Sequence, residues 1–254
     1  MHTPLPNAPD LGHDDWRSRA HCAVSLDLLR RNLPGGTARR ALVLGTGASS
    51  LLERLTSLCE EVICPGEDDL KDLRDREVLP YVEESFDLIC ALGTLSEAHD
   101  DETMISELRR MLAPGGLMLL AVPAHPWLYT KQRKDAGKRY TRRSLAKRLL
   151  DSGLTPERNT YANSLFFALS APAALAARLV DAPESQRRQI PKLADEICYR
   201  AFAAERFVSR HVDLPIGETL VALARRTEST GWLLPKPTKR DLLPRLVRAQ
   251  PACH

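Results

Sequence analysis

The chain has 254 residues and 43% hydrophobic content, which is enough to bury a sizeable core in one large domain with appendages. Its 36 Lys and Arg against 33 Asp and Glu leave a net charge of +3, so overall charge excludes long-range attraction to nucleic acid as the basis of its function. The six cysteines form no C-x-x-C pair, which excludes a disulfide scaffold and argues against structural zinc; we expect no bound metal and reduced thiols in a cytoplasmic protein.

The N-terminal region is predicted to be a polar arm followed by one helix. MHTPLPNAPDLGHDDW lacks the apolar run of a signal peptide. Apolar residues then recur at helical spacing over Asp15–Leu33, and Pro34-Gly35-Gly36 stops the helix. Residues 1–37 are therefore expected to precede the main domain.

Strands and helices alternate through the first half of the remaining chain. ALVLGTG followed by SSLLERLTSL predicts a strand, a tight turn and a helix. Further strands are expected at Glu61–Cys64, Phe86–Leu92, Leu117–Val122 and Glu218–Arg225, and further helices at Asp101–Leu112, Ser144–Leu150, Ala162–Val180 and Pro191–Phe207.

This order predicts an α/β fold, a Rossmann-like doubly wound sheet that is mostly parallel with helices on both faces. We expect one domain over residues 38–226, a helical insertion or lid at about 144–210, and a basic, proline-containing tail over 227–254. In such a fold ligands bind at the carboxyl ends of the strands.

The most apolar stretch is Ser164–Val180, which contains Pro172 and Arg178. It is short and interrupted for a membrane span, so a buried or lid helix is favoured and no transmembrane span is expected. Contact with a membrane surface stays open as the alternative.

Gly45-Thr46-Gly47 stands at the end of the first sheet strand. Glycine there lets the backbone approach a ligand while helix N-terminal amides face it. A tight turn between strand and helix also needs glycine for steric reasons alone, so the pair leaves both interpretations open.

A longer segment carries a family resemblance. SFDLICALGTLSEAHDDETMISELRRMLAPGGLMLLAVPAHPWLY resembles the middle of class I S-adenosylmethionine (SAM)-dependent methyltransferases, with a strand beginning Phe-Asp, an acidic helix, a Leu-x-Pro-Gly-Gly turn and a strand ending in Pro. RYTRRSL and LPIGETLVALARR extend the likeness to a bacterial subgroup often encoded beside glycosyltransferase or natural-product genes. The resemblance implies SAM as cofactor and a small-molecule substrate.

The resemblance also implies a set of cofactor contacts, although this sequence departs from the family pattern. Val43 stands where the family has an acid, and Ser49 replaces the third glycine. Cys64-Pro65-Gly66 stands where the family's second strand ends in an acid, and Ser96-Glu97 replaces a frequent Glu-His pair. The chain between the second strand and Leu79 is shorter than usual, so the family's third strand is expected to be missing. The cofactor contacts implied are Leu44, Gly45, Thr46, Gly47, Glu67, Asp75, Ala91, Leu92 and Gly93.

His125 is the candidate catalytic residue, because it follows a strand at the carboxyl edge and could orient or deprotonate a substrate. The alternative is that its ring caps a turn before Pro126. His99 is expected to be solvent-exposed. Candidate substrate contacts are Tyr129, Arg139 and Tyr140.

Residues 131–148 hold nine basic residues and one acid. Such a run can bind an anionic substrate or form a solvated helix face. The leading hypothesis is a SAM-dependent methyltransferase acting on a natural-product or glycan-related molecule. The alternatives are a protein of this fold that has lost methyl transfer, serving as a scaffold or catalysing cyclisation or rearrangement, and an RNA methyltransferase, for which no RNA-binding module is visible.

Overall fold

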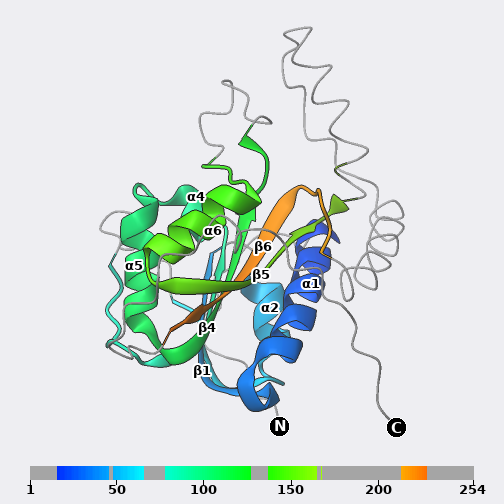
Figure 1. Ribbon diagram of the computed structural model, residues 1–254. Coiled ribbons are helices and arrows are strands. Elements are labelled where there is room, and N and C mark those ends of the chain that lie inside the picture. The colour runs from blue at the N-terminus through cyan, green and yellow to red at the C-terminus, as the bar shows by residue number, and fades with distance from the viewer. Residues whose placement is uncertain are drawn as a thin grey trace, which may run out of the picture.

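The computed structural model describes residues 16–45, 48–65, 78–126, 137–164, 167 and 213–227. Within them the elements follow the alternating order that the sequence predicts (Figure 1). They are α1 (Trp16–Asn32), a short 3-10 turn (Pro34–Gly36), β1 (Ala38–Gly45), α2 (Ala48–Leu55), β2 (Cys59–Ile63), β3 (Phe86–Leu92), α4 (Thr94–Glu97), α5 (Asp101–Met111), β4 (Leu112–Pro123), α6 (Arg142–Asp151), β5 (Leu154–Ala162) and β6 (Thr219–Arg226).

The strands form one mixed sheet in the order β2-β1-β3-β4-β6-β5. The pairs β1/β2, β1/β3 and β3/β4 are parallel, whereas β6 runs antiparallel to both β4 and β5. Five strands therefore share one direction, and their carboxyl ends lie at the same edge of the sheet. The α/β class and the mostly parallel sheet are confirmed.

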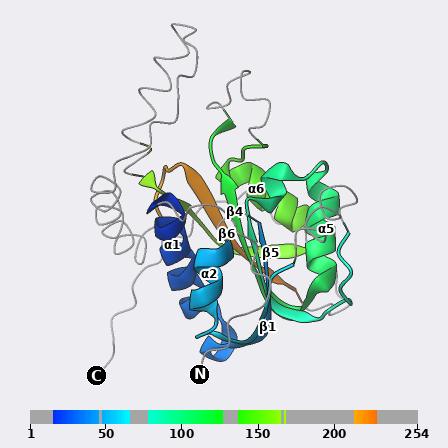
Figure 2. The same cartoon turned by 180° about the vertical axis from the view of Figure 1, so that it is seen from behind.

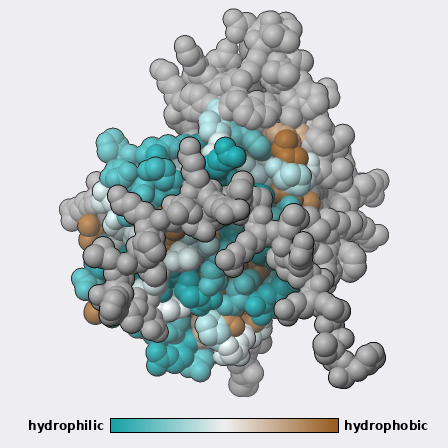
Figure 3. Space-filling view, viewed as in Figure 1, coloured by the Kyte–Doolittle hydropathy of each residue, from teal (hydrophilic) through white to brown (hydrophobic). Residues whose placement is uncertain are grey.

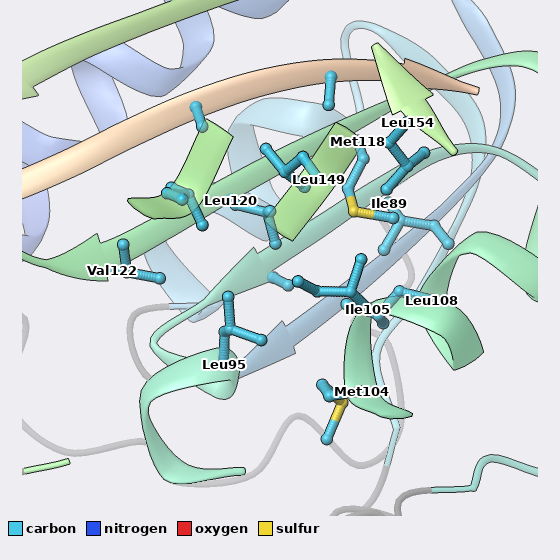
Figure 4. Close-up of a cluster of buried hydrophobic side chains, with 14 of the residues drawn as sticks. Ile89, Leu95, Met104, Ile105, Leu108, Met118, Leu120, Val122, Leu149 and Leu154 are labelled. Atoms are coloured by element: carbon cyan, nitrogen blue, oxygen red, sulfur yellow. The ribbon is translucent and has the colours of Figure 1, made fainter. Parts of the chain in front are cut away.

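Helices cover both faces of this sheet, which accounts for the unbroken apolar character of its central strands. Because successive side chains point to opposite faces, Leu42 of β1 packs with α4, α5 and α6, whereas Val43 packs with α1 and α2. Figure 2 shows the two helical layers on either side of the sheet. Figure 4 shows the core that contains Leu42, to which three helices contribute Leu95, Met104 and Leu149.

The Pro-Gly-Gly segment lies within β4 and is not the simple turn that the sequence predicts. Helix α5 ends at Met111, and Leu112 already pairs with Phe86. The register then shifts, so that Leu88 pairs with Leu117. The Pro114–Gly116 segment is thus accommodated as an irregularity inside β4, with Gly115 at φ 74°.

Strand β5 is absent from the sequence prediction and interrupts the helical insertion expected over about 144–210. Its sequence, LTPERNTYA, is polar and contains Pro156, which cannot donate to a strand ladder. The sheet tolerates these residues because β5 is an edge strand, with a register shift between Pro156 and Arg158. The lid and most of Ala162–Val180 lie outside the described residues.

The sequence analysis expects the family's third strand to be missing between β2 and β3. Between β2 and β3 the structure describes residues 64–65 and 78–85, and no strand occurs in these two stretches. No helix in the described ranges is both long and apolar enough to cross a membrane.

Candidate active site at the carboxyl edge of the sheet

Four strands with a common direction end in residues that adopt left-handed backbone conformations. Gly45 closes β1 at φ 91°, and Gly93 follows β3 at φ 79°. His125 lies just after β4 and Asn163 just after β5, both at φ 61°. Non-glycine residues rarely adopt such values, and this kind of strain concentrates at functional sites. The carboxyl edge is therefore the candidate site.

The strand residues predicted to contact the cofactor offer it only their backbones. Leu44 and Ala91 are fully buried in the core beneath α4, α5 and α6, and Leu92 is buried in the opposite core. Leu44 pairs with Ala91, and Gly45 pairs with Leu92. A ligand at this edge would therefore meet Gly45 and Gly93, which are both partly exposed.

Gly45 is required by the close approach of β1 to the end of β3. A Cβ atom on Gly45 would lie 1.9 Å from the Leu92 carbonyl oxygen and 2.7 Å from the Thr94 hydroxyl oxygen. Thr94 is buried, and its hydroxyl makes no hydrogen bond to the residues that the structure describes. The steric reason for glycine at this position therefore exists independently of any ligand.

The acids that the family uses for its cofactor have no counterpart at two described positions. Val43 is fully buried in an apolar core. After β2 comes the half-buried Cys64, whose thiol pKa is raised by burial. The remaining predicted contacts Thr46, Gly47, Glu67, Asp75 and Tyr129 lie outside the described residues.

His125 is held among aromatic side chains that the sequence analysis did not connect with it. Its ring stacks almost parallel on Tyr161, with 5.2 Å between centroids, and lies 4.6 Å from the centroid of Phe167. Its backbone N–H donates to Tyr140 O at 3.1 Å. These partners come from other segments of the chain, and no local pattern pairs them with His125.

The electrostatic surroundings favour a neutral His125 imidazole. Burial lowers its pKa, the Arg139 charge lowers it further, and a hydrogen bond to the Gly217 backbone opposes the shift. A neutral imidazole at neutral pH can accept a proton, which is what a general base requires.

Arg139 and Tyr140, predicted to contact substrate, are engaged with protein groups. They belong to Gly137–Tyr140, which we call the return segment because the chain rejoins the sheet there. Arg139 donates to Ala124 O at 2.9 Å, and the buried Tyr140 hydroxyl donates to Leu95 O at 3.1 Å. A Cβ on Gly137 would lie 2.3 Å from Ser96 O, so the segment fits tightly against α4.

The chain rejoins the same edge a second time ahead of β6. Leu214 N–H donates to the buried Thr160 hydroxyl at 3.2 Å, and Arg142 donates to Leu214 O at 2.8 Å. Arg142 also lies over the Tyr161 ring, 5.2 Å from its centroid. The chain leaves the sheet after β4 and again after β5, and each time hydrogen bonds join the residues on the two sides of the gap.

Other features of the described surface are less specific. His99 is exposed, and no group of three or more His, Cys, Asp or Glu among the described residues has a metal-binding arrangement. The described surface in Figure 3 is mainly hydrophilic with small apolar areas. The large exposed apolar side chains in the described ranges are Val78, Val82 and Ile216.

Comparison with known families gives this geometry a context. Residues 69–120 match the family model described as a methyltransferase domain. The methyltransferase-domain segment includes β3, α4, α5 and most of β4, so it contributes the Gly93 corner and leads to the strand before His125. The resemblance to class I SAM-dependent methyltransferases is confirmed.

Solved structures, two methyltransferases among them, are similar to this chain at low identity. Burkholderia thailandensis 1,6-didemethyltoxoflavin-N1-methyltransferase, solved with bound 1,6-didemethyltoxoflavin and S-adenosylhomocysteine, has 15% identity and a TM-score of 0.48, covering 84% of this chain and 80% of that one. A SAM-dependent methyltransferase of Thermotoga maritima has 16% identity and a TM-score of 0.48, covering 84% and 93%. YcgJ of Bacillus subtilis has 12% identity and a TM-score of 0.49, covering 82% and 99%. These likenesses are too distant to assign a substrate.

Proposed function

We propose that this protein is a SAM-dependent methyltransferase acting on a small molecule of natural-product or glycan type. The observation that carries the proposal is the methyltransferase-domain match, which covers β3 and most of β4, two of the four strands that end at the candidate site. The left-handed corners at Gly45 and Gly93 support the assignment, because they leave partly exposed backbone at the edge where ligands bind in this class of fold.

The described residues fit a cofactor through backbone rather than through charge. Gly45 and Gly93 would hold SAM, with Thr46, Gly47, Glu67 and Asp75 as further proposed contacts. SAM supplies an electrophilic methyl group on a cationic sulfonium. The chain's task is to orient the acceptor and exclude water, and orientation alone can provide much of the rate.

His125 is the residue proposed to take the acceptor's proton. The lowered pKa keeps its imidazole neutral, and its stacking on Tyr161 fixes the ring plane. Tyr129, Arg139 and Tyr140 remain the proposed substrate side of the site; for Arg139 and Tyr140 the contacts described above suggest a role in shaping it rather than in binding directly.

Calorimetric titration with SAM and with S-adenosylhomocysteine tests the cofactor, with ATP as a matched adenosine ligand. We expect saturable heat for the first two ligands and none for ATP. Thermal stabilisation should accompany binding, by about 2.7 kcal/mol at a hundred times the dissociation constant. Absence of both heat and stabilisation at millimolar SAM would remove the proposal.

A second candidate is a protein that keeps this fold without methyl transfer, as a scaffold or as an enzyme of cyclisation or rearrangement. It is favoured by the buried Val43 and by the Cys64-Pro65 end of the second strand, where the family places carboxylates. Loss of one carboxylate with two hydroxyl bonds costs about 1.5–3 kcal/mol, or roughly ten- to a hundredfold in affinity. Binding of SAM without any methylated product in mass spectra would favour this second candidate.

A further inference from the structure

Two neighbouring acids at the start of α5 have different surroundings. Asp100 caps the helix, accepting from the Glu102 and Thr103 N–H groups at 3.3 and 3.2 Å. The Asp101 side chain is only 2% exposed. It forms ion pairs with the Lys138 ammonium and, at 3.1 Å, with the Arg148 guanidinium.

The ion pairs of Asp101 join three parts of the chain. Asp101 belongs to α5, Lys138 to the return segment and Arg148 to α6. A buried carboxylate without partners is strongly unfavourable, so the two cations must stay close to it. The Lys138 ammonium also donates to His99 O at 2.9 Å, which fixes it to the loop before α5.

The return segment in turn contacts His125 through its backbone. Lys138 N–H donates to Ser96 O at 2.8 Å, and Tyr140 N–H donates to Pro123 O at 2.9 Å. Tyr140 O then accepts from His125 N–H at 3.1 Å. The Tyr140 hydroxyl donates to Leu95 O at 3.1 Å, and burial together with the nearby Asp101 carboxylate raises the pKa of the phenol.

We propose that Asp101 is a positioning residue, which acts through Lys138 and Tyr140 to hold His125 in its left-handed conformation at the carboxyl edge. This inference rests on the proposed function, since it assigns Asp101 to the acceptor side of the same site. Asp101 touches neither substrate nor cofactor in this role. If Asp101 contributed only to global stability, removing its charge would accelerate amide hydrogen exchange to the same extent in all regions of the sheet.

Amide hydrogen exchange in Asp101→Asn separates these two roles, with Asp100→Asn as matched control because Asn caps helices as well as Asp does. We expect exchange at His125, Lys138 and Tyr140 to accelerate at least about tenfold more than at Val43 and Cys90 in the sheet core. Uniform acceleration, or none beyond that of the control, would overturn the proposal.

The His125 imidazole gives a second readout that a purely stabilising role would not change. In Asp101→Asn its pKa, followed by NMR, should move up toward the ordinary value of 6.5, because a loosened ring is less buried. An unchanged pKa contradicts the inference. If the Asn variant does not fold, Lys138→Met removes one partner while Arg148 keeps the carboxylate paired, and the same two measurements apply.

Neither measurement requires the cofactor. A protein that fails to bind SAM yet shows selective exchange at the return segment would refute the proposed function and retain the positioning role of Asp101 within the fold. A protein that binds SAM but shows no selective exchange at the return segment would support the proposed function and refute the positioning role of Asp101. The two failures are therefore distinguishable.

Discussion

At the residue scale, the left-handed glycines differ in what surrounds them. Gly45 combines φ 91° with backbone atoms of β3 at contact distance, whereas Gly35 has φ 67° and nothing within 4 Å of the position that a Cβ atom would take. Conformational strain should affect both positions, and crowding only Gly45. Comparing the two separates these contributions.

Gly45→Ala should lower the free energy of unfolding by at least about 3 kcal/mol, since the added Cβ meets the Leu92 carbonyl. Gly35→Ala should cost only about 1–2 kcal/mol from the left-handed backbone. Chemical denaturation of both variants provides the measurement. Equal losses would mean that β1 and β3 separate easily at this edge.

His125 should make stability depend on pH. Its folded-state pKa lies below 6.5, so between that value and 6.5 the unfolded chain binds more protons, and stability falls as the pH is lowered through this range. The slope contributed by one group is at most about 1.4 kcal/mol per pH unit.

The matched variants are His125→Asn and His99→Asn, since Asn also tolerates a left-handed backbone. The first should reduce the loss of stability below pH 6.5, while the second, at an exposed position, should leave the profile nearly as in the parent protein. Unfolding curves across this range check the expectation. A measured His125 pKa at or above 6.5 would contradict it.

Whether the sequence predicts a feature of a single residue depends on how far along the chain that residue's partners lie. Gly45, Gly93 and His125 follow apolar strands, so their place at the carboxyl edge is predictable from local pattern. The contacts of His125 with Tyr161 and of Asp101 with Lys138 connect segments more than 30 residues apart, and nothing in their local spacing indicates them. Whether the proposed residues act in catalysis remains a prediction.

At the element scale, Arg225 near the end of β6 connects this strand to three neighbouring elements. Arg225 donates to Gly115 O at 2.9 Å and to Asn32 O at 3.0 Å, and it pairs with Glu157. One guanidinium therefore connects β5, the irregular start of β4 and the last turn of α1, whose terminal carbonyls need donors. A lysine cannot span these acceptors.

Arg225→Lys should therefore cost about 1–3 kcal/mol of unfolding free energy although it preserves the charge. Arg39→Lys is the control, because its side chain is 79% exposed and its nitrogen lies 3.7 Å from Asp87. That change should be close to neutral. Urea denaturation distinguishes the two, and a neutral Arg225→Lys would show that the guanidinium contacts contribute little.

Elements were predictable where burial dictates their sequence. Phe86–Leu92 is apolar except for Asp87 and lies between two neighbouring strands, and its predicted bounds match β3. Strand β5 lies at the edge of the sheet and does not need to be apolar throughout. It contains polar residues and a proline, so its sequence shows no strand pattern. The Pro-Gly-Gly segment indicates a chain reversal in sequence terms, yet pairing of Leu112 with Phe86 draws it into β4.

At the scale of the whole molecule, two apolar cores sandwich one sheet, and access to the middle requires global opening. Cys90 lies at 0% exposure in central β3, and burial together with neighbouring thiols raises its pKa. Cys64, after β2, is only half-buried and has its thiol pKa raised by burial.

Peptide-resolved alkylation should therefore modify Cys64 in the folded protein and Cys90 only through unfolding, at least about a thousandfold more slowly. The Cys90 rate should rise with urea in parallel with global unfolding, while the Cys64 rate changes little until the transition. Comparable rates for both thiols in buffer would indicate that the sheet opens locally between β1 and β4.

At the carboxyl edge, hydrogen bonds join the chain on both sides of each of the two segments that leave the sheet, and this affects how the protein can diversify. A hydrogen bond joins His125 to Tyr140 after β4, and another joins Thr160 to Leu214 after β5. The hydrogen bonds at this edge of the sheet therefore do not depend on which residues lie between these partners. Doubling the length of a flexible connection costs only about 0.6 kcal/mol. Evolution can thus change the length and sequence of the intervening chain while the strand pairing of the sheet is inherited unaltered.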